Sequence, residues 1–421
     1  MKDANNVPKL RFPEFKGSWE RQKLGDVFEQ TSFFVNPRIR NIELWSLTVE
    51  DGLTPKSERY NREFLVKKDD IFKEVRPGDI VYNPMNMTLG AVGYNGMEKS
   101  VAVSGYYVTM FAKENYDTYF INTWLKSPQA IQLYKIHATG TLIEKQRVQF
   151  PTLSIISVVF PDYKEQKKIG YLFEIIDNLI ALHQRKCDKL KEYKKGCLQK
   201  MFPRGDADVP EVRFPGFTGA WERRKFGEVF EGLQNNTLSR AELNNDGGDV
   251  KNVHYGDVLI KFGDYIDASR DELPFIANNE ITKKYSASFL RDGDIIIADT
   301  AEDETVGKCS EIVGSTGMKI LSGLHTIPCR PREKYAPKFL GYYINSDAYH
   351  SRLIPLMQGI KVTSISKSAL QDTDLILPKS YDEQAKIGEY FSNLDNLIAL
   401  QKRECEKYKE LKKGLLQQMF V

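Results

Sequence analysis

A long, charged, amphipathic stretch occurs twice in this chain, and the duplication constrains the fold more than any other feature. The first copy runs from Glu165 to Phe202 and the second from Glu383 to Phe420. The copies align without a gap, about two-thirds of their positions are identical, and both contain Asp-Asn-Leu-Ile-Ala-Leu. An internal repeat of this kind indicates a duplicated architecture, which limits the possible folds more than any local sequence pattern does.

Apolar residues recur in both copies at alternating spacings of four and three, the 3.5-residue period of a coiled coil. The other positions are mostly charged or amide residues, so each helix buries one stripe and needs a partner. We therefore expect the two helices to pack on each other, antiparallel, with Lys194 and Lys412 as matching charged interruptions. The seam residues are Ile169, Phe173, Ile176, Ile180, His183 and Leu190 in the first copy, and Ile387, Phe391, Leu394, Ile398, Gln401 and Tyr408 in the second. Full overlap would place His183 opposite Gln401, a polar pair of the kind that fixes register.

A shorter duplicated segment precedes each half of the chain. Residues 7–30 and 209–232 share the pattern Arg-Phe-Pro-x-Phe-x-Gly-x-Trp. Its prolines and glycines exclude a long helix, and its aromatic residues provide anchors. We interpret the segment as a docking strap followed by a short helix, and the second strap as a turn at the end of the first long helix.

Between these repeats lie two regions, 21–160 and 223–377, that differ in sequence but keep landmarks in the same order. Strand-like runs are Asp79–Tyr82, Ala91–Tyr94 and Val101–Phe111, and a helical stretch spans Tyr116–Lys126. Pro77-Gly-Asp-Ile-Val81 is answered by Asp292-Gly-Asp-Ile-Ile296 in the second region. The pattern predicts one α+β fold used twice, closing into a pseudo-two-fold ring. The expected parts are residues 1–160 (strap and first domain), 161–202 (helix), 203–222 (strap), 223–378 (second domain) and 379–421 (helix).

Composition narrows the function classes. The formal net charge of +3 is nearly neutral, so nucleic-acid binding has to be argued from local clusters of basic residues. The five cysteines form no CxxC pair and no zinc-type spacing, which suits a reducing compartment. No apolar run is long enough to span a membrane, and the sequence starts without a signal-peptide core. These features indicate a cytoplasmic protein without a membrane partner.

Catalytic motifs are weak. The loop Asn83-Pro84-Met85-Asn86 resembles the Asn-Pro-Pro-aromatic loop of amino-methyltransferases but lacks the second proline and the stacking aromatic. The run from Pro161 to Lys167 imitates a nuclease signature, yet its carboxylates are too close in sequence to share a metal. No glycine-rich dinucleotide or phosphate loop is present. His254 is expected to precede a strand and to be structural, so the inventory predicts no catalytic residue and no metal site.

Recognition remains as the function. Arg, Lys, Asn and Gln can read base edges, while Ser, Thr and Lys commonly hold phosphate. Such residues gather in glycine-containing loops at equivalent places in both regions. The DNA-binding candidates are Asn83, Asn86, Thr88, Thr139, Thr141, Lys145, Gln146, Arg147, His325, Lys361, Thr363, Ser364, Ser366 and Lys367. For any one of them, a solvated loop residue is the alternative.

The duplicated strap, the Arg76-Pro-Gly-Asp-Ile-Val-Tyr-Asn-Pro-Met-Asn86 run and the twin helices together resemble the specificity subunit of type I restriction–modification systems. The resemblance covers essentially the whole chain. It implies two target recognition domains that read double-stranded DNA, and helices that bind two methyltransferase subunits and support the restriction subunits. It places S-adenosylmethionine on the modification subunit, which methylates adenine N6, and ATP and Mg²⁺ on the restriction subunit, with no cofactor in this chain.

On this interpretation the helix pair is a ruler between two half-sites. A helix of about 37 residues is roughly 55 Å long, and half-sites one turn apart lie roughly 34–36 Å centre to centre. Two alternatives stay open at this stage: a coiled-coil scaffold or adaptor without DNA reading, and a DNA-dependent enzyme that acts alone.

Overall fold

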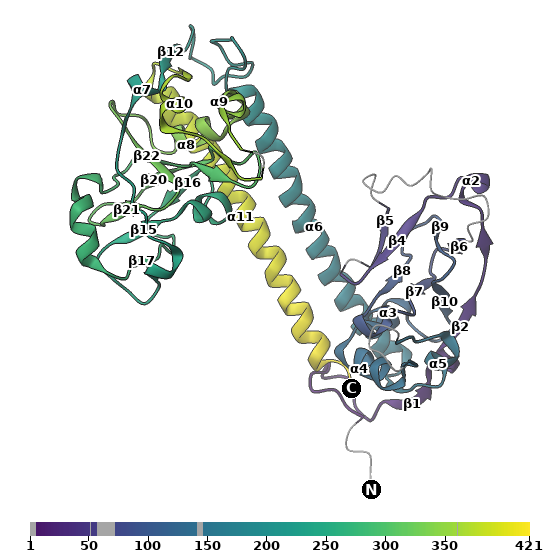
Figure 1. Ribbon diagram of the computed structural model, residues 1–421. Coiled ribbons are helices and arrows are strands. Elements are labelled where there is room, and N and C mark those ends of the chain that lie inside the picture. Colours follow the sequence, from purple (N-terminus) through teal and green to yellow (C-terminus); the bar gives the residue numbers. More distant parts are fainter. Residues whose placement is uncertain (1–5, 51, 57–71, 141–145, 360) are drawn as a thin grey trace. The chain divides into compact units, whose positions relative to one another are not determined.

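The computed structural model describes residues 6–50, 52–56, 72–140, 146–359 and 361–421 (Figure 1). The chain divides into two compact units: unit 1 combines Met1–Gln184 with Lys402–Val421, and unit 2 is Arg185–Gln401. Each unit therefore contains one strap, one α+β domain and a segment of each long helix. The unit boundaries fall within the long helices, whereas the sequence analysis divided the chain at the helix ends.

The two repeats are single helices, α6 (Tyr163–Met201) and α11 (Tyr381–Gln418). The Asp162 carboxylate accepts a hydrogen bond from the Glu165 backbone N–H at 2.9 Å, which caps the start of α6. At the start of α11 the Ser380 carbonyl accepts from the Gln384 N–H at 3.1 Å. Both helices thus begin two residues before the sequence repeats, at equivalent tyrosines.

Within each unit the helical segments run antiparallel. In unit 1 the Phe173 ring stacks on Phe420 at 5.8 Å, and the Lys412 Nζ lies 2.6 Å from the Asp177 carboxylate. In unit 2 the equivalent contacts are Phe391 on Phe202, at 5.9 Å, and Lys194 on Asp395, at 2.7 Å. The predicted antiparallel pairing is confirmed, and the two charged interruptions of the seam are ion pairs that cross it.

The predicted seam residues lie along this contact. Ile169, Phe173, Ile176, Ile387, Phe391 and Leu394 are buried, and Ile180, His183, Leu190, Ile398, Gln401 and Tyr408 are half-buried. The His183 ring stacks on the Tyr408 ring at 5.6 Å, within unit 1. Because His183 and Gln401 belong to different units, their pairing stays a prediction.

The domain of unit 1 is built on a four-stranded sheet in the order β2-β10-β7-β8, beside a three-stranded sheet β3-β6-β9 and the pairs β1-β11 and β4-β5. Its strands are β1 (Glu20–Lys23), β2 (Phe28–Thr31), β3 (Phe34–Val35), β4 (Trp45–Thr48), β5 (Gly52–Pro55), β6 (Phe72–Val75), β7 (Ile80–Tyr82), β8 (Val92–Tyr94), β9 (Val101–Ser104), β10 (Val108–Ala112) and β11 (Ser157–Phe160). Its helices are α1 (Leu24–Val27), α2 (Pro37–Arg40), α3 (Thr118–Leu125), α4 (Pro128–His137) and α5 (Phe150–Ser154). The run predicted as strand over Val101–Phe111 is two strands, because the chain turns between Ser104 and Val108.

The domain of unit 2 repeats this plan with additions. Its main sheet has the order β13-β22-β18-β20-β16, in which β16 is an extra edge strand parallel to β20. Its strands are β12 (Glu222–Lys225), β13 (Phe230–Gly232), β14 (Leu243–Asn244), β15 (Lys251–Val253), β16 (Tyr265–Asp267), β17 (Phe275–Ile276), β18 (Ile295–Ala298), β19 (Thr300–Ala301), β20 (Cys309–Val313), β21 (Ile320–Ser322), β22 (Thr326–Pro331), β23 (Thr363–Ser364) and β24 (Asp374–Leu377). Its helices are α7 (Phe226–Val229), α8 (Phe339–Asn345), α9 (Asp347–Leu353) and α10 (Lys367–Gln371). His254 follows β15 and leads into a π-helical turn, Asp257–Lys261, so the expectation that it precedes a strand was wrong.

Each strap joins the end of one long helix to the start of the other. In unit 1 the Leu10 N–H donates to the carbonyl of Gln418 at the end of α11 (2.9 Å), while Arg11 binds Glu165 at the start of α6. In unit 2 the Val212 N–H donates to Lys200 of α6 at 2.9 Å, and Arg213 binds Glu383 of α11. The short helices predicted after the straps are α1 and α7.

The last residues of each long helix enter a domain core. Met419 and Phe420 are packed with Trp19 and Phe120 in the core of unit 1. Met201 and Phe202 take the same places in the core of unit 2, against Trp221 and Phe339. Each domain is therefore completed by the helix that follows the other domain in the sequence.

Candidate nucleic-acid interface

In unit 1 the loop after β7 carries the first group of predicted DNA contacts. The Asn83 side-chain oxygen accepts a hydrogen bond from the Met85 N–H at 3.0 Å, so this half-buried residue shapes the loop. Asn86 is exposed, and Thr88 is half-buried in a 3₁₀ turn, Met87–Leu89, that packs on α4. Leu89 at the end of this turn has 59% of its surface exposed, which leaves an apolar side chain beside polar ones.

The second predicted segment of unit 1 lies against this loop. Thr139 and Arg147 exchange two backbone hydrogen bonds, of 3.0 and 2.9 Å, and the Val148 N–H donates to the Pro84 carbonyl at 3.0 Å. Gln146 is half-buried and Arg147 is exposed, with its guanidinium 5.9 Å from the centre of the Tyr106 ring. The structure thus brings two predicted segments together. Thr141 and Lys145 lie outside the described residues.

Unit 2 repeats the same backbone frame with different side chains. Gln358 and Ser364 exchange hydrogen bonds of 2.9 and 2.8 Å, and the Ile365 N–H donates to the Asp299 carbonyl at 2.9 Å. These bonds match those of Thr139, Arg147, Val148 and Pro84 one for one. We call the two loops joined in this way, in either unit, the loop pair.

The loop pair of unit 2 also contacts His325. Thr363 and Ser364 pair with Ala301 and Thr300 as strands β23 and β19. His325 follows the Ser322-Gly323 turn, and its Nδ1 lies 3.3 Å from the Asp299 carboxylate. His325 is therefore placed with Thr363 and Ser364, as one surface made from three segments.

The other candidates of unit 2 differ in role. Lys361 is exposed beside the loop pair. The Ser366 hydroxyl accepts from the Ala369 N–H at 3.1 Å and so caps α10. The Lys367 ammonium occupies the space that a Cβ on Gly232 would need, which directs it over strand β13.

Three residues at this surface were not among the sequence candidates: Tyr106, Asp299 and Thr300. The sequence carries a signal for two of them, because Ala298-Asp299-Thr300-Ala301 stands at the place in the second domain that Asn83-Pro84-Met85-Asn86 has in the first. Aligning the two domains thus indicates Asp299 and Thr300. The residue aligned with His325 after the shared Ser-Gly pair is Tyr107, so its neighbour Tyr106 is placed at this surface by the fold alone.

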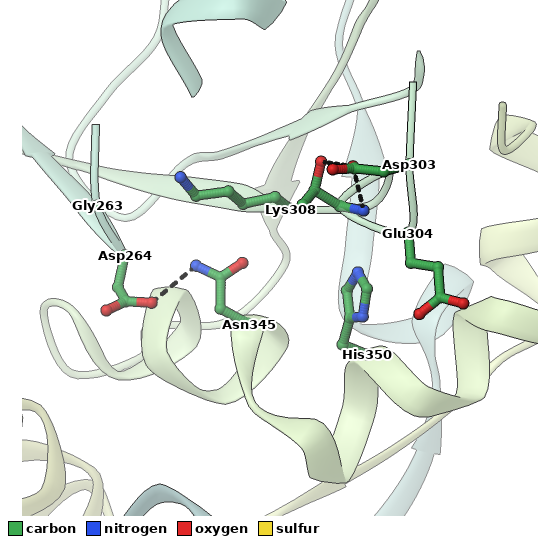
Figure 2. A pocket seen from close by; sticks show the side chains of 8 residues that line it. Gly263, Asp264, Asp303, Glu304, Lys308, Asn345 and His350 are labelled. Carbon is green, nitrogen blue, oxygen red and sulfur yellow. Dashed lines mark hydrogen bonds between the residues drawn. The ribbon is translucent and has the colours of Figure 1, made fainter. Parts of the chain in front are cut away.

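A hollow of about 650 Å³ opens elsewhere in unit 2 (Figure 2). Asp264, Asp303 and Glu304 contribute carboxylates to its wall. Its potential proton donors are already engaged. Lys308 donates to the carbonyls of Leu259 and Phe262 at 2.8 and 2.9 Å, and the His350 Nε2 lies 2.8 Å from the Val306 carbonyl. Because the wall is acidic and its Lys308 and His350 groups are already hydrogen-bonded to backbone carbonyls, it is unfavourable for binding phosphate.

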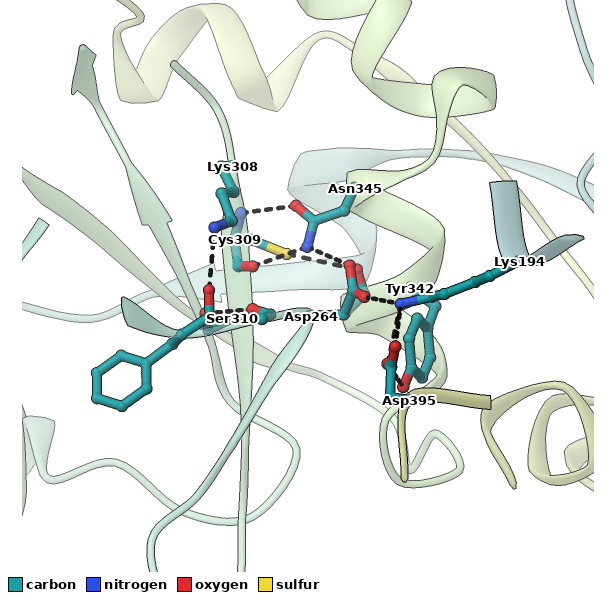
Figure 3. A network of polar contacts seen from close by, with 11 residues as sticks. Lys194, Asp264, Lys308, Cys309, Ser310, Tyr342, Asn345 and Asp395 are labelled. Atoms are coloured by element: carbon teal, nitrogen blue, oxygen red, sulfur yellow. Dashed lines mark hydrogen bonds and ion pairs between the residues drawn. The ribbon is translucent and has the colours of Figure 1, made fainter. Parts of the chain in front are cut away.

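A buried polar network attaches this part of unit 2 to the helices (Figure 3). The Lys194 ammonium lies 2.8 Å from Asp264 and 2.7 Å from Asp395, and the Tyr342 hydroxyl donates to Asp395 at 2.6 Å. Burial by itself would lower the pKa of Lys194, but the two carboxylates outweigh it and raise the pKa. The lysine is thus held charged, and it fixes domain 2 to both helical segments. In unit 1 the Tyr119 hydroxyl donates to Asp177 at 2.8 Å in a similar way.

Across the described residues, no group of three or more His, Cys, Asp and Glu side chains is arranged to hold a metal ion. Within the same part of the chain, no helix is apolar over a length sufficient to cross a membrane. What the geometry offers instead is a surface of amide, hydroxyl, guanidinium and imidazole groups on one backbone frame, present twice. Two unlike polar surfaces on one backbone frame, each beside a pair of helical segments, are typical of proteins that recognise a partner.

The comparisons with known proteins agree. Residues 219–410 match the family described as the type I restriction modification DNA specificity domain. Over 97% of its length the chain is 22% identical to the type I restriction enzyme MjaVIII specificity subunit of Methanocaldococcus jannaschii, of which the alignment covers 92%. A second relative from that organism, the putative type I restriction enzyme MjaX specificity subunit, is also 22% identical, over 98% of this chain and 95% of its own. Over nearly its whole length the chain is thus similar to type I restriction enzyme specificity subunits, and its second half matches their DNA specificity domain.

Solved structures share the fold. The crystal structure of a type I restriction-modification system S subunit from M. genitalium superimposes with a TM-score of 0.58 at 15% identity, covering 99% of both chains. A chain from a study of complex assembly and conformational transition in a type I R-M system gives 0.51 at 17% identity, covering 96% of this chain and 97% of the other. The predicted α+β class, with two globular domains and two long helices, is therefore confirmed.

Proposed function

We propose that the chain reads a bipartite, asymmetric double-stranded DNA target, with the loop pair of unit 1 on one half-site and that of unit 2 on the other. The observation that carries this proposal is the repeated backbone frame. In unit 1 the Val148 N–H donates to the Pro84 carbonyl, and in unit 2 the Ile365 N–H makes the equivalent bond to the Asp299 carbonyl. The side chains carried by the two frames differ. One scaffold with two sets of side chains suits a target whose halves are unlike.

The chemistry of each loop pair fits base reading. Asn86 and Arg147 of unit 1 are exposed side chains of the types that form two hydrogen bonds with adenine or guanine in the major groove. Ser364 and Lys361 of unit 2 are exposed groups suited to phosphate or base contacts. The backbones of Asn86, Arg147 and Ser364 are hydrogen-bonded within the loop pairs, which reduces the entropy that these residues lose on binding.

We further propose that the chain acts as a non-catalytic subunit in the cytoplasm, together with two modification subunits and with restriction subunits. On this proposal the S-adenosylmethionine, the ATP and the Mg²⁺ belong to those partners, and the methylated atom is adenine N6. The similarity to type I specificity subunits supports these partners, and the paired helices supply a surface for them. The alternative, a scaffold without DNA reading, is not favoured, because the matched family is a DNA specificity domain.

The helices are proposed as the ruler between half-sites. Deleting or inserting one turn in both α6 and α11 within the paired region should change the length of the unread gap and leave both half-site sequences unchanged. Methylome sequencing of a host that carries the chain and its partners measures both quantities. Altered half-sites with an unaltered gap would contradict the ruler.

The reading surfaces are tested by the same assay. Replacing Arg147 and Asn86 with alanine should relax or abolish recognition of one half-site only. Replacing Lys361, Thr363 and Ser364 should affect only the other, so each set is the control for its counterpart. A complex that binds and methylates DNA with no preferred motif, before or after these changes, would reject the proposed function.

A further inference from the structure

His325 is an exposed imidazole held in place from three directions. Its Nδ1 lies 3.3 Å from the Asp299 Oδ1 and 3.5 Å from the Thr300 Oγ1. The Tyr255 ring meets it edge to face at 5.3 Å between ring centres. About half of the side chain, 48%, stays exposed. An exposed histidine with so many ordered neighbours presents its remaining face in a fixed direction.

The backbone at His325 is also constrained. Its φ is +55°, in the left-handed region that costs a residue with a Cβ about 1 kcal/mol or more. The Asp299 N–H donates to the His325 carbonyl at 3.1 Å, so the same aspartate holds both the backbone and the ring. Glycine or asparagine would adopt this conformation more easily. The backbone conformation therefore does not explain a histidine at this position, and we attribute it to the imidazole.

The neighbours determine which ring nitrogen carries the proton in the neutral imidazole. The Thr300 hydroxyl donates its proton to Asp299 Oδ1 at 2.7 Å. Thr300 Oγ1 can therefore only accept from His325, and the Asp299 carboxylate can only accept as well. Both groups facing Nδ1 are acceptors, so the proton resides on Nδ1. Among the described residues no hydrogen bond is made by Nε2, which is then left as an acceptor on a half-exposed ring.

We propose that Nε2 of His325 accepts a hydrogen bond from the exocyclic amino group of a base in the major groove, and that Asp299 is the positioning residue that makes it an acceptor. Adenine N6 and cytosine N4 are the amino donors displayed in that groove, whereas guanine and thymine present acceptors there. The half-site read by unit 2 thus contains an adenine or cytosine at the position facing His325. This inference rests on the proposed function, since it needs the loop pair of unit 2 to lie on DNA.

Unit 1 does not repeat the device. Its residue aligned with His325 is Tyr107, and the preceding Tyr106 lies 5.9 Å from the Arg147 guanidinium. A guanidinium is a donor only, so the loop pair of unit 1 favours acceptors such as guanine O6 and N7. The two surfaces therefore read opposite hydrogen-bond patterns, which agrees with an asymmetric target.

The test uses the chain in complex with its modification subunits at pH 8. Methylome sequencing first gives the target. Each adenine or cytosine of the unit 2 half-site is then replaced, one at a time, by purine or pyrimidin-2-one, which lack the amino group. We expect one position at which this replacement weakens binding about 5- to 30-fold, as for the loss of one good base contact of roughly 1–2 kcal/mol.

The variant H325G keeps the left-handed backbone and removes the imidazole. It should bind the natural duplex as weakly as the wild-type complex binds the amino-free one, with no further loss on the amino-free duplex. D299A should reduce the same discrimination, whereas K361A, the matched control, should weaken all duplexes equally. H325G that still discriminates at every position would overturn the inference. If the wild-type complex binds equally well to duplexes with and without the unit 2 half-site, the proposed function is rejected instead.

Discussion

Arg11 and Glu165 form a bidentate ion pair, with both nitrogen–oxygen distances at 2.7 Å, that joins the first strap to the start of α6. The Arg11 guanidinium also donates to the Gly17 carbonyl at 2.5 Å, which closes the strap on itself. Arg213, Glu383 and Gly219 repeat every one of these contacts in unit 2. The side chain of the first glutamate of each helix repeat is 1% exposed. Its role is therefore structural, since it binds the strap arginine.

Removing one partner of this buried pair should destabilise only its own unit. E165A leaves the Arg11 guanidinium without its counter-charge, and breaking such a pair costs about 3–5 kcal/mol. Urea unfolding followed by hydrogen exchange in each unit would locate the loss in unit 1. E383A is the matched variant and should place the same loss in unit 2. A change below about 0.5 kcal/mol in either case would mean that the pair does not secure the strap.

The sequence predicted the helix repeats, the seam and the strap because each depends on local periodicity or composition. It did not predict what the charged interruptions do. From the sequence alone Lys194 and Lys412 are only breaks in the seam, since their partners Asp395 and Asp177 lie on the opposite helix, far away in sequence. Such partners become evident only when the antiparallel register is known.

The candidate interface was predicted as segments but not as a surface. The loops of unit 1 meet because the Val148 N–H donates to the Pro84 carbonyl. This backbone hydrogen bond is non-local, and no pattern of side chains in the sequence predicts it. Ser366 and Lys367 were selected for their chemistry alone, and the structure places one in a helix cap and the other over Gly232. Residue type predicts what a group can bind, whereas its direction is set by contacts made elsewhere in the chain.

Two glycines of α6 should respond in opposite ways to alanine. A Cβ on Gly170 would lie 2.4 Å from the Asp117 carboxylate, which caps α3, and 3.0 Å from the Phe120 nitrogen. G170A should therefore destabilise unit 1 by about 1–3 kcal/mol, as overpacking does. Gly196 has nothing within 4 Å of the same position, so G196A should stabilise the helix by up to about 1 kcal/mol. Thermal unfolding of both variants measures the difference, and a stabilising G170A would show that the close approach is not rigid.

The two seam lysines, Lys194 and Lys412, should contribute different amounts to the free energy of unfolding. Lys194 is 15% exposed and faces both Asp264 and Asp395, whereas Lys412 is 25% exposed and faces Asp177 alone. K194M leaves two carboxylates close together and should cost about 3 kcal/mol or more, while K412M should cost about half as much. Urea unfolding compares them. Equal losses would indicate that Asp264 does not contribute to the attachment of domain 2.

The stability of unit 2 should depend on pH through Glu311. Burial raises the pKa of this carboxyl from its ordinary value to about 7, although its two oxygens accept the Lys338 and Gly341 N–H groups at 2.6 and 2.9 Å. Between its ordinary pKa and about 7 the folded chain binds more protons than the unfolded chain at this group, so stability falls as the pH rises, by at most about 1.4 kcal/mol per unit. Above about 7 no further loss is expected.

E311Q removes the titration and should flatten this part of the profile, although its amide loses one of the two acceptors and lowers the stability at pH 5. The informative quantity is the slope between pH 5 and 7 relative to wild type, measured by urea unfolding at each pH. Identical slopes would exclude Glu311 as the titrating group.

The final prediction concerns the far end of the chain. Phe420 is 3% exposed, stacks on Phe173 and lies 5.6 Å from Phe120 in the core of unit 1. F420A should therefore unfold a domain encoded some three hundred residues earlier, at a cost of about 3–5 kcal/mol. F202A should do the same to unit 2, because Phe202 stacks on Phe391 there. Hydrogen exchange resolves the two units, and loss of protection confined to the last turn of α11 in F420A would show that unit 1 is complete without it. The expected result is the reverse: the α+β domain of each unit loses its protection when the helix encoded after the other domain loses its terminal phenylalanine.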